Sequence, residues 1–287
     1  MGRQVQLLEL LVGIEGLALL RHLVDGTDAD AAQRTAEVRR LLSDADLETA
    51  EYTSESDARS GYAAWSLNYD EPGNPVIALE EPAVWSLVAD VPPGRALDAA
   101  CGTGRHARQL LELGHEVMGV DLSPEMLAVA RARVPGATFL EGDLQDIPGA
   151  AGEFDLVVCG LALAHVVDLG AAVTELSRVL RPGGRLVVSV LHPFQAYLGW
   201  HAPFADEDGQ RRFVREYTHR HGDYLAAFAA AGLSVRSCVE PELTANEVQA
   251  KRRAFCHIPE ATTAAYLGLP AVLVWDAEKT AALPLPT

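Results

Sequence analysis

Positive charge is scarce in this chain. Its 287 residues contain Lys+Arg 23 against Asp+Glu 40, for a net charge of −17, and its lysines are Lys251 and Lys279 alone. Such an acidic surface repels phosphate backbones and anionic membranes, so we expect no nucleic acid and no membrane as a partner. The shortage of lysine beside abundant arginine is typical of a GC-rich genome.

Cysteine pairs are also missing. The four cysteines, Cys101, Cys159, Cys238 and Cys256, stand far apart, and none has the C-x-x-C spacing of a zinc site or a redox dithiol. No group of histidines and carboxylates stands at metal-ligand spacing, so no metal site is predicted. Cys101 and Cys159 lie in apolar contexts typical of small buried thiols. These absences fit a reducing cytoplasm, the location that we expect.

A long uninterrupted apolar run is absent as well. The most apolar stretch, Val5–Val24, contains Glu9, Glu15, Arg21 and His22. It therefore predicts a buried helix rather than a membrane span. The first residues also lack the basic start and small-residue cleavage site of a signal peptide.

Apolar residues are plentiful, at 49% of the chain, and its length suffices for one large α/β domain with an extension. The predicted strands are 95–101, 116–121, 137–142, 155–161, 185–192, 233–239 and 271–276. The predicted helices between them are about 104–113, 123–133, 168–180 and 222–231. This alternation predicts an α/β fold, with a mostly parallel sheet covered by helices on both faces.

Residues 1–50 are predicted to form an N-terminal helical extension. Its two helices, 4–25 and 28–46, carry apolar surface that needs covering. The cover is either a partner subunit in a homodimer or the main domain of the same chain, which the helices would cap as a lid. Residues 52–82 carry loop signals and are interpreted as a transition.

The remaining residues, 51–287, form the predicted main domain. Two long segments, 193–221 and 241–270, interrupt its alternation of strands and helices. Long insertions in a compact domain are usually lids or substrate walls. We therefore expect both insertions on the substrate side of the domain.

A strand, a glycine turn and a helix over residues 96–107 organise the main domain. Gly102 and Gly104 have no Cβ, so the backbone can approach a ligand closely at this turn. Asp98, at the end of the strand, would repel a phosphate group because both are negatively charged. Its carboxylate suits a ligand with a cationic, amine-bearing end. The turn alone leaves two candidate ligands, a dinucleotide and S-adenosylmethionine.

Other acidic residues narrow the choice of ligand. The turn formally satisfies the dinucleotide pattern G-x-G-x-x-[GA], and Asp121, at the end of the second strand, can take ribose hydroxyls in either ligand. Asp98 would repel a pyrophosphate. Asp143, at the end of the third strand, can accept from an exocyclic amine, with Leu144 packed on the base. Asp98 and Asp143 therefore favour S-adenosylmethionine over a dinucleotide.

Five motifs occur in order: Leu97–Gly104, Gly119–Met126, Gly142-Asp143, Phe154–Val157 and Leu180–Gly184. Together they resemble the class I S-adenosylmethionine-dependent methyltransferases, most strongly from about residue 60 to 195. The resemblance implies a Rossmann-like, seven-stranded sheet whose last strand is antiparallel and inserted beside the fifth. It also implies S-adenosyl-L-methionine as the cofactor.

The resemblance assigns roles to single residues. Gly102 and Gly104 would line the methionine portion of the cofactor, Asp98 would hold its amino end, and Asp121 would take the ribose hydroxyls. The other implied contacts are Ala100 in the glycine turn, Leu122 and Met126 around the adenine, Asp143 and Leu144 at the adenine amine, Cys159 and Gly160 near the sulfonium, and Tyr69 closing over the methionine end.

Methyl transfer from a sulfonium is an in-line displacement by an O, N or C nucleophile, for which a base can be helpful. Histidine is the usual base near neutral pH. The candidates are His192 and His201, in the segment that leaves the fifth strand, and His165 after the fourth. Each has a structural alternative, such as a strand-end hydrogen bond for His192 or packing beside the cofactor for His165. His219 and His221 open a predicted helix.

The predicted acceptor wall is aromatic. Its members are Trp65, Tyr69, Phe194, Tyr197, Trp200 and Phe204. Such a wall suits a small, aromatic or polyketide-like methyl acceptor, as in bacterial secondary metabolism. The alternatives are a protein that binds S-adenosylmethionine without methyl transfer (cyclase-like or non-catalytic), an NAD-dependent oxidoreductase, and a methyltransferase acting on protein or RNA.

Overall fold

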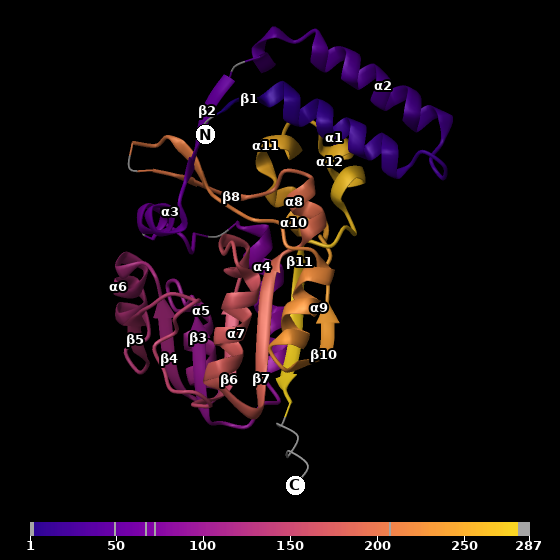
Figure 1. The fold of residues 1–287 in the computed structure, drawn as a ribbon. Helices are drawn as coiled ribbons and strands as arrows, with labels where there is room; N and C mark the ends of the chain where they lie inside the picture. Colours follow the sequence, from indigo (N-terminus) through magenta and orange to yellow (C-terminus); the bar gives the residue numbers. More distant parts are fainter. Residues whose placement is uncertain (1–2, 49, 67, 72, 207, 281–287) are drawn as a thin grey trace.

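The computed structural model describes residues 3–48, 50–66, 68–71, 73–206 and 208–280. Residues 281–287, which the prediction assigns to the main domain, lie outside the described residues. The described chain forms two sheets with helices around them, and the larger sheet lies at the end of the molecule that carries the C-terminus (Figure 1).

The larger sheet has seven strands in the order β10-β11-β7-β6-β3-β4-β5. The strands are β3 (Arg95–Ala99), β4 (Glu116–Asp121), β5 (Thr138–Glu141), β6 (Phe154–Gly160), β7 (Leu180–Leu191), β10 (Leu233–Val239) and β11 (Val272–Lys279). Strand β11 lies between β7 and β10 and is antiparallel to both, while β7, β6, β3, β4 and β5 are parallel. The implied strand order is confirmed.

Helices cover both faces of this sheet. Successive side chains of each strand point to opposite faces, and since these side chains are apolar on both faces, both need covering. On one face Val157 packs with residues of α7 (Leu169–Val179) and α9 (His221–Ala230). On the other face Leu156 and Val158 pack with α4 (Pro75–Val88), α5 (Arg105–Glu112) and α6 (Pro124–Arg133). Continuous burial of this kind explains why the strands are near-continuous apolar runs.

A second, four-stranded sheet was not predicted. Its order is β1-β2-β9-β8, with β1 (Arg3–Gln6), β2 (Ala50–Ser56), β8 (Ala202–Ala205) and β9 (Arg211–Val214). It joins the N-terminal segment to the insertion 193–221, which also holds α8 (Pro193–Tyr197). The predicted helix over 4–25 is therefore wrong at its start, where β1 pairs with β2.

The stretch 52–82 is more ordered than its loop signals indicate. It contains most of β2, then α3 (Ala58–Trp65) and the first half of α4. Asp57 caps α3 by accepting from the Ser60 N–H, and Asn74 caps α4 in the same way. Both are favoured N-cap residues, so the polar residues that suggested loops are here the starts of helices.

The two N-terminal helices, α1 (Leu7–Arg21) and α2 (Asp28–Leu42), lie beyond the end of the large sheet (Figure 1). The second insertion, 241–270, holds α10 (Ala245–Ala250), α11 (Arg252–Phe255) and α12 (Pro259–Tyr266), and α1 packs on α12. Arg21 donates to the carbonyls of Ala264, Ala265 and Leu267 at 3.1, 3.0 and 2.9 Å. A cation here satisfies the unpaired carbonyls at the end of α12.

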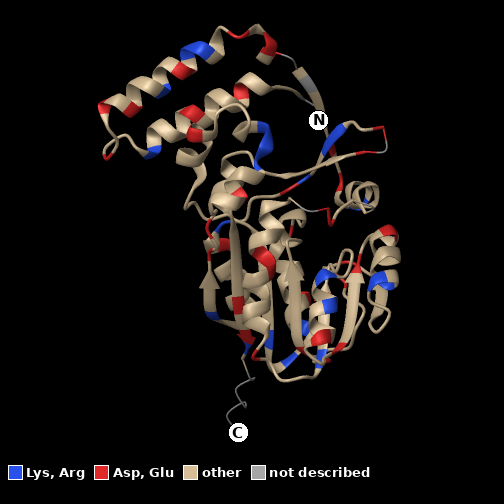
Figure 2. Ribbon diagram, turned by 180° about the vertical axis from the view of Figure 1, so that it is seen from behind, with Lys and Arg blue, Asp and Glu red and all other residues tan. Residues whose placement is uncertain are grey.

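None of the helices in the described part of the chain has the length and apolarity needed to cross a membrane. Basic residues are spread over separate elements among the acidic ones (Figure 2).

Candidate functional site

The glycine turn after β3 lies at the carboxyl edge of the large sheet, where open α/β folds bind ligands. Asp98 is 1% exposed. One carboxylate oxygen, Oδ2, accepts from the Ala107 N–H at 2.8 Å, whereas Oδ1 has no hydrogen-bond partner among the described residues. Burial raises the pKa of Asp98 to about 6. This oxygen is itself buried, and it keeps an unused capacity to accept a hydrogen bond at this edge.

Backbone strain gathers at the same edge. Ala100, after β3, and Leu161, after β6, have φ angles of 58° and 54°, a region that non-glycine residues rarely adopt. Gly102 and Gly104 also have positive φ, at 52° and 85°. A Cβ built on Gly102 would have no neighbour within 4 Å. The turn therefore has open space above it, and strained residues on neighbouring strands are typical of functional sites.

Asp121, at the end of β4, accepts hydrogen bonds from the glycine turn after β3 and from the turn that follows β4. Its Oδ2 accepts from the Gly102 N–H at 2.8 Å and its Oδ1 accepts from the Ser123 N–H at 2.9 Å. Burial raises its pKa. Asp143 follows β5 and is exposed, so its carboxylate is accessible to a ligand beside the buried Leu144.

The remaining residues predicted to contact the cofactor differ in how far their side chains are exposed to the site. Leu122 is half-buried at the edge, whereas Met126 is 1% exposed. The Cys159 side chain is fully buried in the core against α7, so only its backbone can face the site. Gly160 is necessarily small, because a Cβ would lie 2.5 Å from Nε2 of His106.

A buried ionic network lies below this edge and was missed by the sequence analysis. Glu80, fully buried on α4, accepts from Ser189 Oγ at 2.6 Å, contacts His106 Nε2 at 2.9 Å and pairs with Arg105 at 3.1 Å. Burial alone would raise the pKa of Glu80, but His106 and Arg105 hold it at about 2. Because these residues come from α4, α5 and β7, the network fixes the glycine turn relative to the neighbouring strands.

Aromatic side chains cover the edge from α3 and the residues after it. Trp65 lies 5.0 Å from Tyr69 and 5.9 Å from Phe204 of β8, measured between ring centroids. The Tyr62 hydroxyl lies 2.7 Å from Nε2 of His165. Nδ1 of His165 lies 2.7 Å from a backbone carbonyl, to which it must donate, so Nε2 accepts from Tyr62. Burial lowers the pKa of His165.

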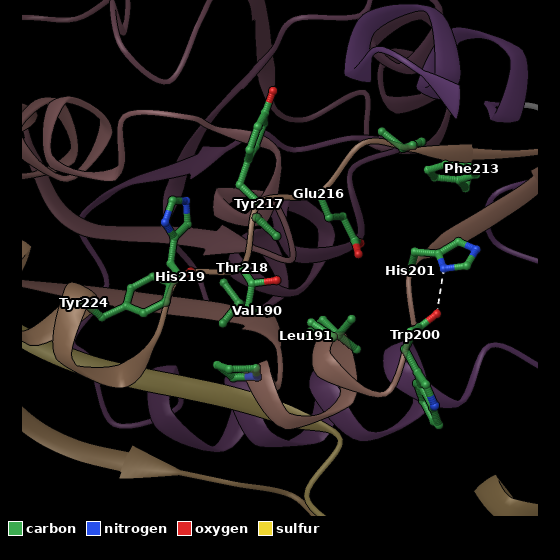
Figure 3. A pocket seen from close by; sticks show the side chains of 15 residues that line it. Val190, Leu191, Trp200, His201, Phe213, Glu216, Tyr217, Thr218, His219 and Tyr224 are labelled. Carbon is green, nitrogen blue, oxygen red and sulfur yellow. Dashed lines mark hydrogen bonds between the residues drawn. The ribbon is translucent and has the colours of Figure 1, made fainter. Parts of the chain in front are cut away.

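A cavity of about 240 Å³ lies at the ends of β6 and β7, beside the strands that carry the glycine turn (Figure 3). Its lining residues are Ala164, Val190, Leu191, Pro193, Ala196, Gly199, Trp200, His201, Phe213, Val214, Glu216, Tyr217, Thr218, His219 and Tyr224. Most belong to the insertion 193–221, whereas the described residues of the second insertion, 241–270, contribute none to the lining. The carboxylate in this lining is Glu216, which points into the cavity in Figure 3, and burial raises its pKa to about 7.

The three candidate histidines have different surroundings. His201 lines the cavity, and its Nδ1 lies 2.8 Å from the carbonyl of Gly199 (Figure 3). His165 is held between Tyr62 and the backbone, as described above. His192 is not among the cavity-lining residues. Its Nδ1 accepts from the Phe194 N–H and caps α8, the strand-end hydrogen bond of its structural alternative.

His192 also belongs to a cluster that sequence spacing could not show. Its Nε2 lies 2.9 Å from Oε1 of Glu240, and Nε2 of His221 lies 3.1 Å from the same oxygen. The three ligand atoms lie within 4.8 Å of one another, close enough for a metal ion. However, Nδ1 of His192 accepts a hydrogen bond from the Phe194 N–H, so in the neutral ring the proton is on Nε2, which is then not free to bind a metal. The geometry fits a hydrogen-bonded cluster.

Comparisons with known proteins agree with this geometry. Residues 97–188 match a family described as a methyltransferase domain. A demethylmenaquinone methyltransferase of Thermus thermophilus is 43% identical over 173 residues, which cover 52% of this chain and 79% of that protein. One from Beutenbergia cavernae is 35% identical over 138 residues, or 45% of this chain and 58% of that protein.

A solved structure extends the likeness beyond the matched motifs. The S-adenosylmethionine-dependent methyltransferase of Mesorhizobium loti shares 27% identity, with a TM-score of 0.54, over 70% of this chain and 97% of that one. The chain nevertheless spans only 58% and 53% of the length of the first two curated relatives that it matches.

Proposed function

This chain belongs to the S-adenosylmethionine-dependent methyltransferases, and from that premise we propose that it transfers a methyl group to O, N or C of a small, aromatic or polyketide-like acceptor. The observation that carries the proposal is the adjacency of two sites on one sheet edge. Asp98 lies near the end of β3, the glycine turn follows that strand and Asp121 ends β4, while the aromatic-walled cavity is lined by residues at the end of β7 and after β6. Relatives named for a quinone acceptor support an aromatic substrate.

In this proposal the chain holds S-adenosylmethionine through its own polar groups. The Asp121 carboxylate accepts from the ribose hydroxyls, and the unpartnered oxygen of Asp98 lies toward the amino end of the methionine portion. Asp143 accepts from the adenine amine. The open space above Gly102 accommodates the methionine portion of the cofactor. Tyr69 covers this portion from the side of α3.

The bound cofactor supplies an electrophilic methyl group. The chain aligns the acceptor with that methyl and excludes water, which is the protein's usual contribution to such a reaction. The aromatic cover from α3 and β8 and the apolar walls of the cavity perform this exclusion. Of the proposed histidine bases, His201 is the one whose side chain lines the cavity.

Calorimetric titration with S-adenosylhomocysteine, and separately with NADH, tests this proposal. We expect S-adenosylhomocysteine to bind with a dissociation constant in the micromolar range and NADH to give no heat of binding, because a pyrophosphate beside Asp98 would be repelled. Supplying S-adenosylmethionine with a panel of aromatic acceptors should then release S-adenosylhomocysteine. Binding without turnover on any acceptor would favour the non-catalytic alternative, and binding of NADH in its place would reject the proposal.

We also propose a homodimer through the N-terminal helices. Although α1 is covered by α12 of its own chain, Leu20, Leu23, Val24 and Leu42 stay 68%, 75%, 95% and 60% exposed. Multi-angle light scattering should give twice the chain mass for the wild type. A variant with Leu20, Val24 and Leu42 changed to serine should give the monomer mass. A monomeric wild type would end this proposal.

A further inference from the structure

The cavity wall holds a carboxylate without a matching cation. No lysine or arginine is among the described residues that line the cavity with Glu216. The arginines near it in the sequence are engaged elsewhere, since Arg212 pairs with Asp206, Arg215 with Glu55 and Arg220 with Asp223. Among the described residues, the backbone N–H of Ala202 donates to the Glu216 carboxylate.

A buried carboxylate is costly unless it is protonated or a ligand compensates its charge. The surrounding wall is suited to such a ligand. The rings of Phe213 and Tyr224 line the same cavity, and aromatic faces attract ammonium groups through their quadrupole. The Trp200 ring, which also lines the cavity, already has Nζ of Lys251 at 3.2 Å from its centroid. A carboxylate or phosphate on the acceptor would meet Glu216 with no lysine or arginine of the described lining to offset the repulsion.

We propose that the cavity binds its acceptor as a protonated amine with an aromatic body, and that Glu216 is the residue that pairs with the ammonium group. This inference rests on the proposed methyl transfer and names the acceptor class for it. The aromatic rings hold the body of the acceptor, and Glu216 sets the position of its nitrogen. The acceptor atom is then nitrogen, rather than oxygen or carbon.

The position of Glu216 relative to the cofactor site fits this role. Burial raises the pKa of the Tyr62 hydroxyl, and the carboxylates of Glu216 and Asp121 raise it further. Tyr62 therefore lies within electrostatic reach of both the cavity carboxylate and the carboxylate that we assign to the ribose. Its contact with His165, beside the cavity residue Ala164, links the two sites.

The chemical step follows from this placement. The Glu216 carboxylate takes one proton from the ammonium group, which leaves a lone pair on nitrogen. The nitrogen forms a bond to the methyl carbon as the carbon–sulfur bond breaks, and the electron pair of that bond stays on sulfur as S-adenosylhomocysteine forms. The product leaves as the methylated ammonium, and Glu216 returns its proton to water.

Three ligands of similar shape test the inference by calorimetry on the protein saturated with S-adenosylhomocysteine: phenethylamine, 2-phenylethanol and 3-phenylpropionate. We expect the amine to bind at least about tenfold more tightly than either analogue, the usual advantage of a charge-assisted hydrogen bond. Glu216→Gln should remove this preference while leaving affinity for the alcohol within about twofold.

Glu112→Gln is the matched control, since Glu112 is exposed at the end of α5, away from the cavity lining. It should behave as the wild type. Equal affinity for the amine and the alcohol, tighter binding of the acid, no binding of the amine, or a Glu216→Gln variant that keeps the preference would each overturn the inference. Because S-adenosylhomocysteine binding is measured first, such results would leave the proposed cofactor site standing, and turnover of phenols alone would leave methyl transfer standing.

Discussion

Replacing Asp121 by alanine is expected to weaken the binding of S-adenosylhomocysteine by about 100-fold or more. The variant loses two charge-assisted hydrogen bonds to the ribose, each worth about 1.5–3 kcal/mol. It also loses the bonds that hold Gly102 and Ser123, so the glycine turn is no longer fixed before the ligand arrives. Calorimetric titration measures the change directly.

Glu116→Ala provides the control for this experiment. Glu116 begins the same strand that Asp121 ends, and its side chain is 77% exposed at the opposite edge of the sheet. Its affinity for S-adenosylhomocysteine should equal that of the wild type. If the Asp121 variant bound within threefold of the wild type, the assignment of this carboxylate to the ribose would be wrong.

Replacing Asp98 by asparagine is expected to stabilise the fold at pH 8 by up to about 3 kcal/mol, and to weaken cofactor binding about tenfold. The pKa of Asp98 rises from 3.8 to about 6 because the carboxylate is buried. The amide keeps an oxygen for the Ala107 N–H but carries no charge to desolvate. Gain of stability with loss of binding is the pattern of a group retained for its ligand.

The sign of the pH dependence follows from linkage. As pH rises, the unfolded chain loses the Asp98 proton near pH 4 while the folded protein keeps it to about pH 6, so this group disfavours folding increasingly across that interval. The stability difference between variant and wild type should be near zero below about pH 4 and reach its maximum above about pH 6. Urea unfolding at several pH values measures it. Asp90→Asn, with a side chain 74% exposed, should show no such trend.

The sequence predicts most of the large sheet and its cofactor edge. Apolar runs and glycine turns are local patterns, so β3, β4 and the turn at Gly102 can be located from them. The strand order was implied only by the resemblance to the methyltransferase family. The second sheet leaves no comparable pattern. Strand β2 is polar, and it is a strand because Ser54–Ser56 pair with Arg212–Val214 far along the chain.

The cavity residues were harder to predict for a related reason. Glu216 stands in the polar run Arg215–His219, which reads as a loop, and only the folding of that run over β7 buries it. His192, His221 and Glu240 come from three separate elements, so no spacing along the chain reveals their contact. Glu80 is hidden within the apolar helix α4, where the adjacent acidic residues Glu80 and Glu81 resemble ordinary surface positions.

The small sheet has a consequence for acceptor preference. Its strand β9 supplies Phe213 and Val214 to the cavity, and this strand is held in register by β2, which precedes the glycine turn by some forty residues. In the proposed assignment, the carboxylates that hold the cofactor (residues 98–143) and the residues that line the cavity (164–224) occupy separate stretches of the chain. Substitutions in β2 are therefore expected to change acceptor preference through the position of β9, while the carboxylates assigned to the cofactor stay in place.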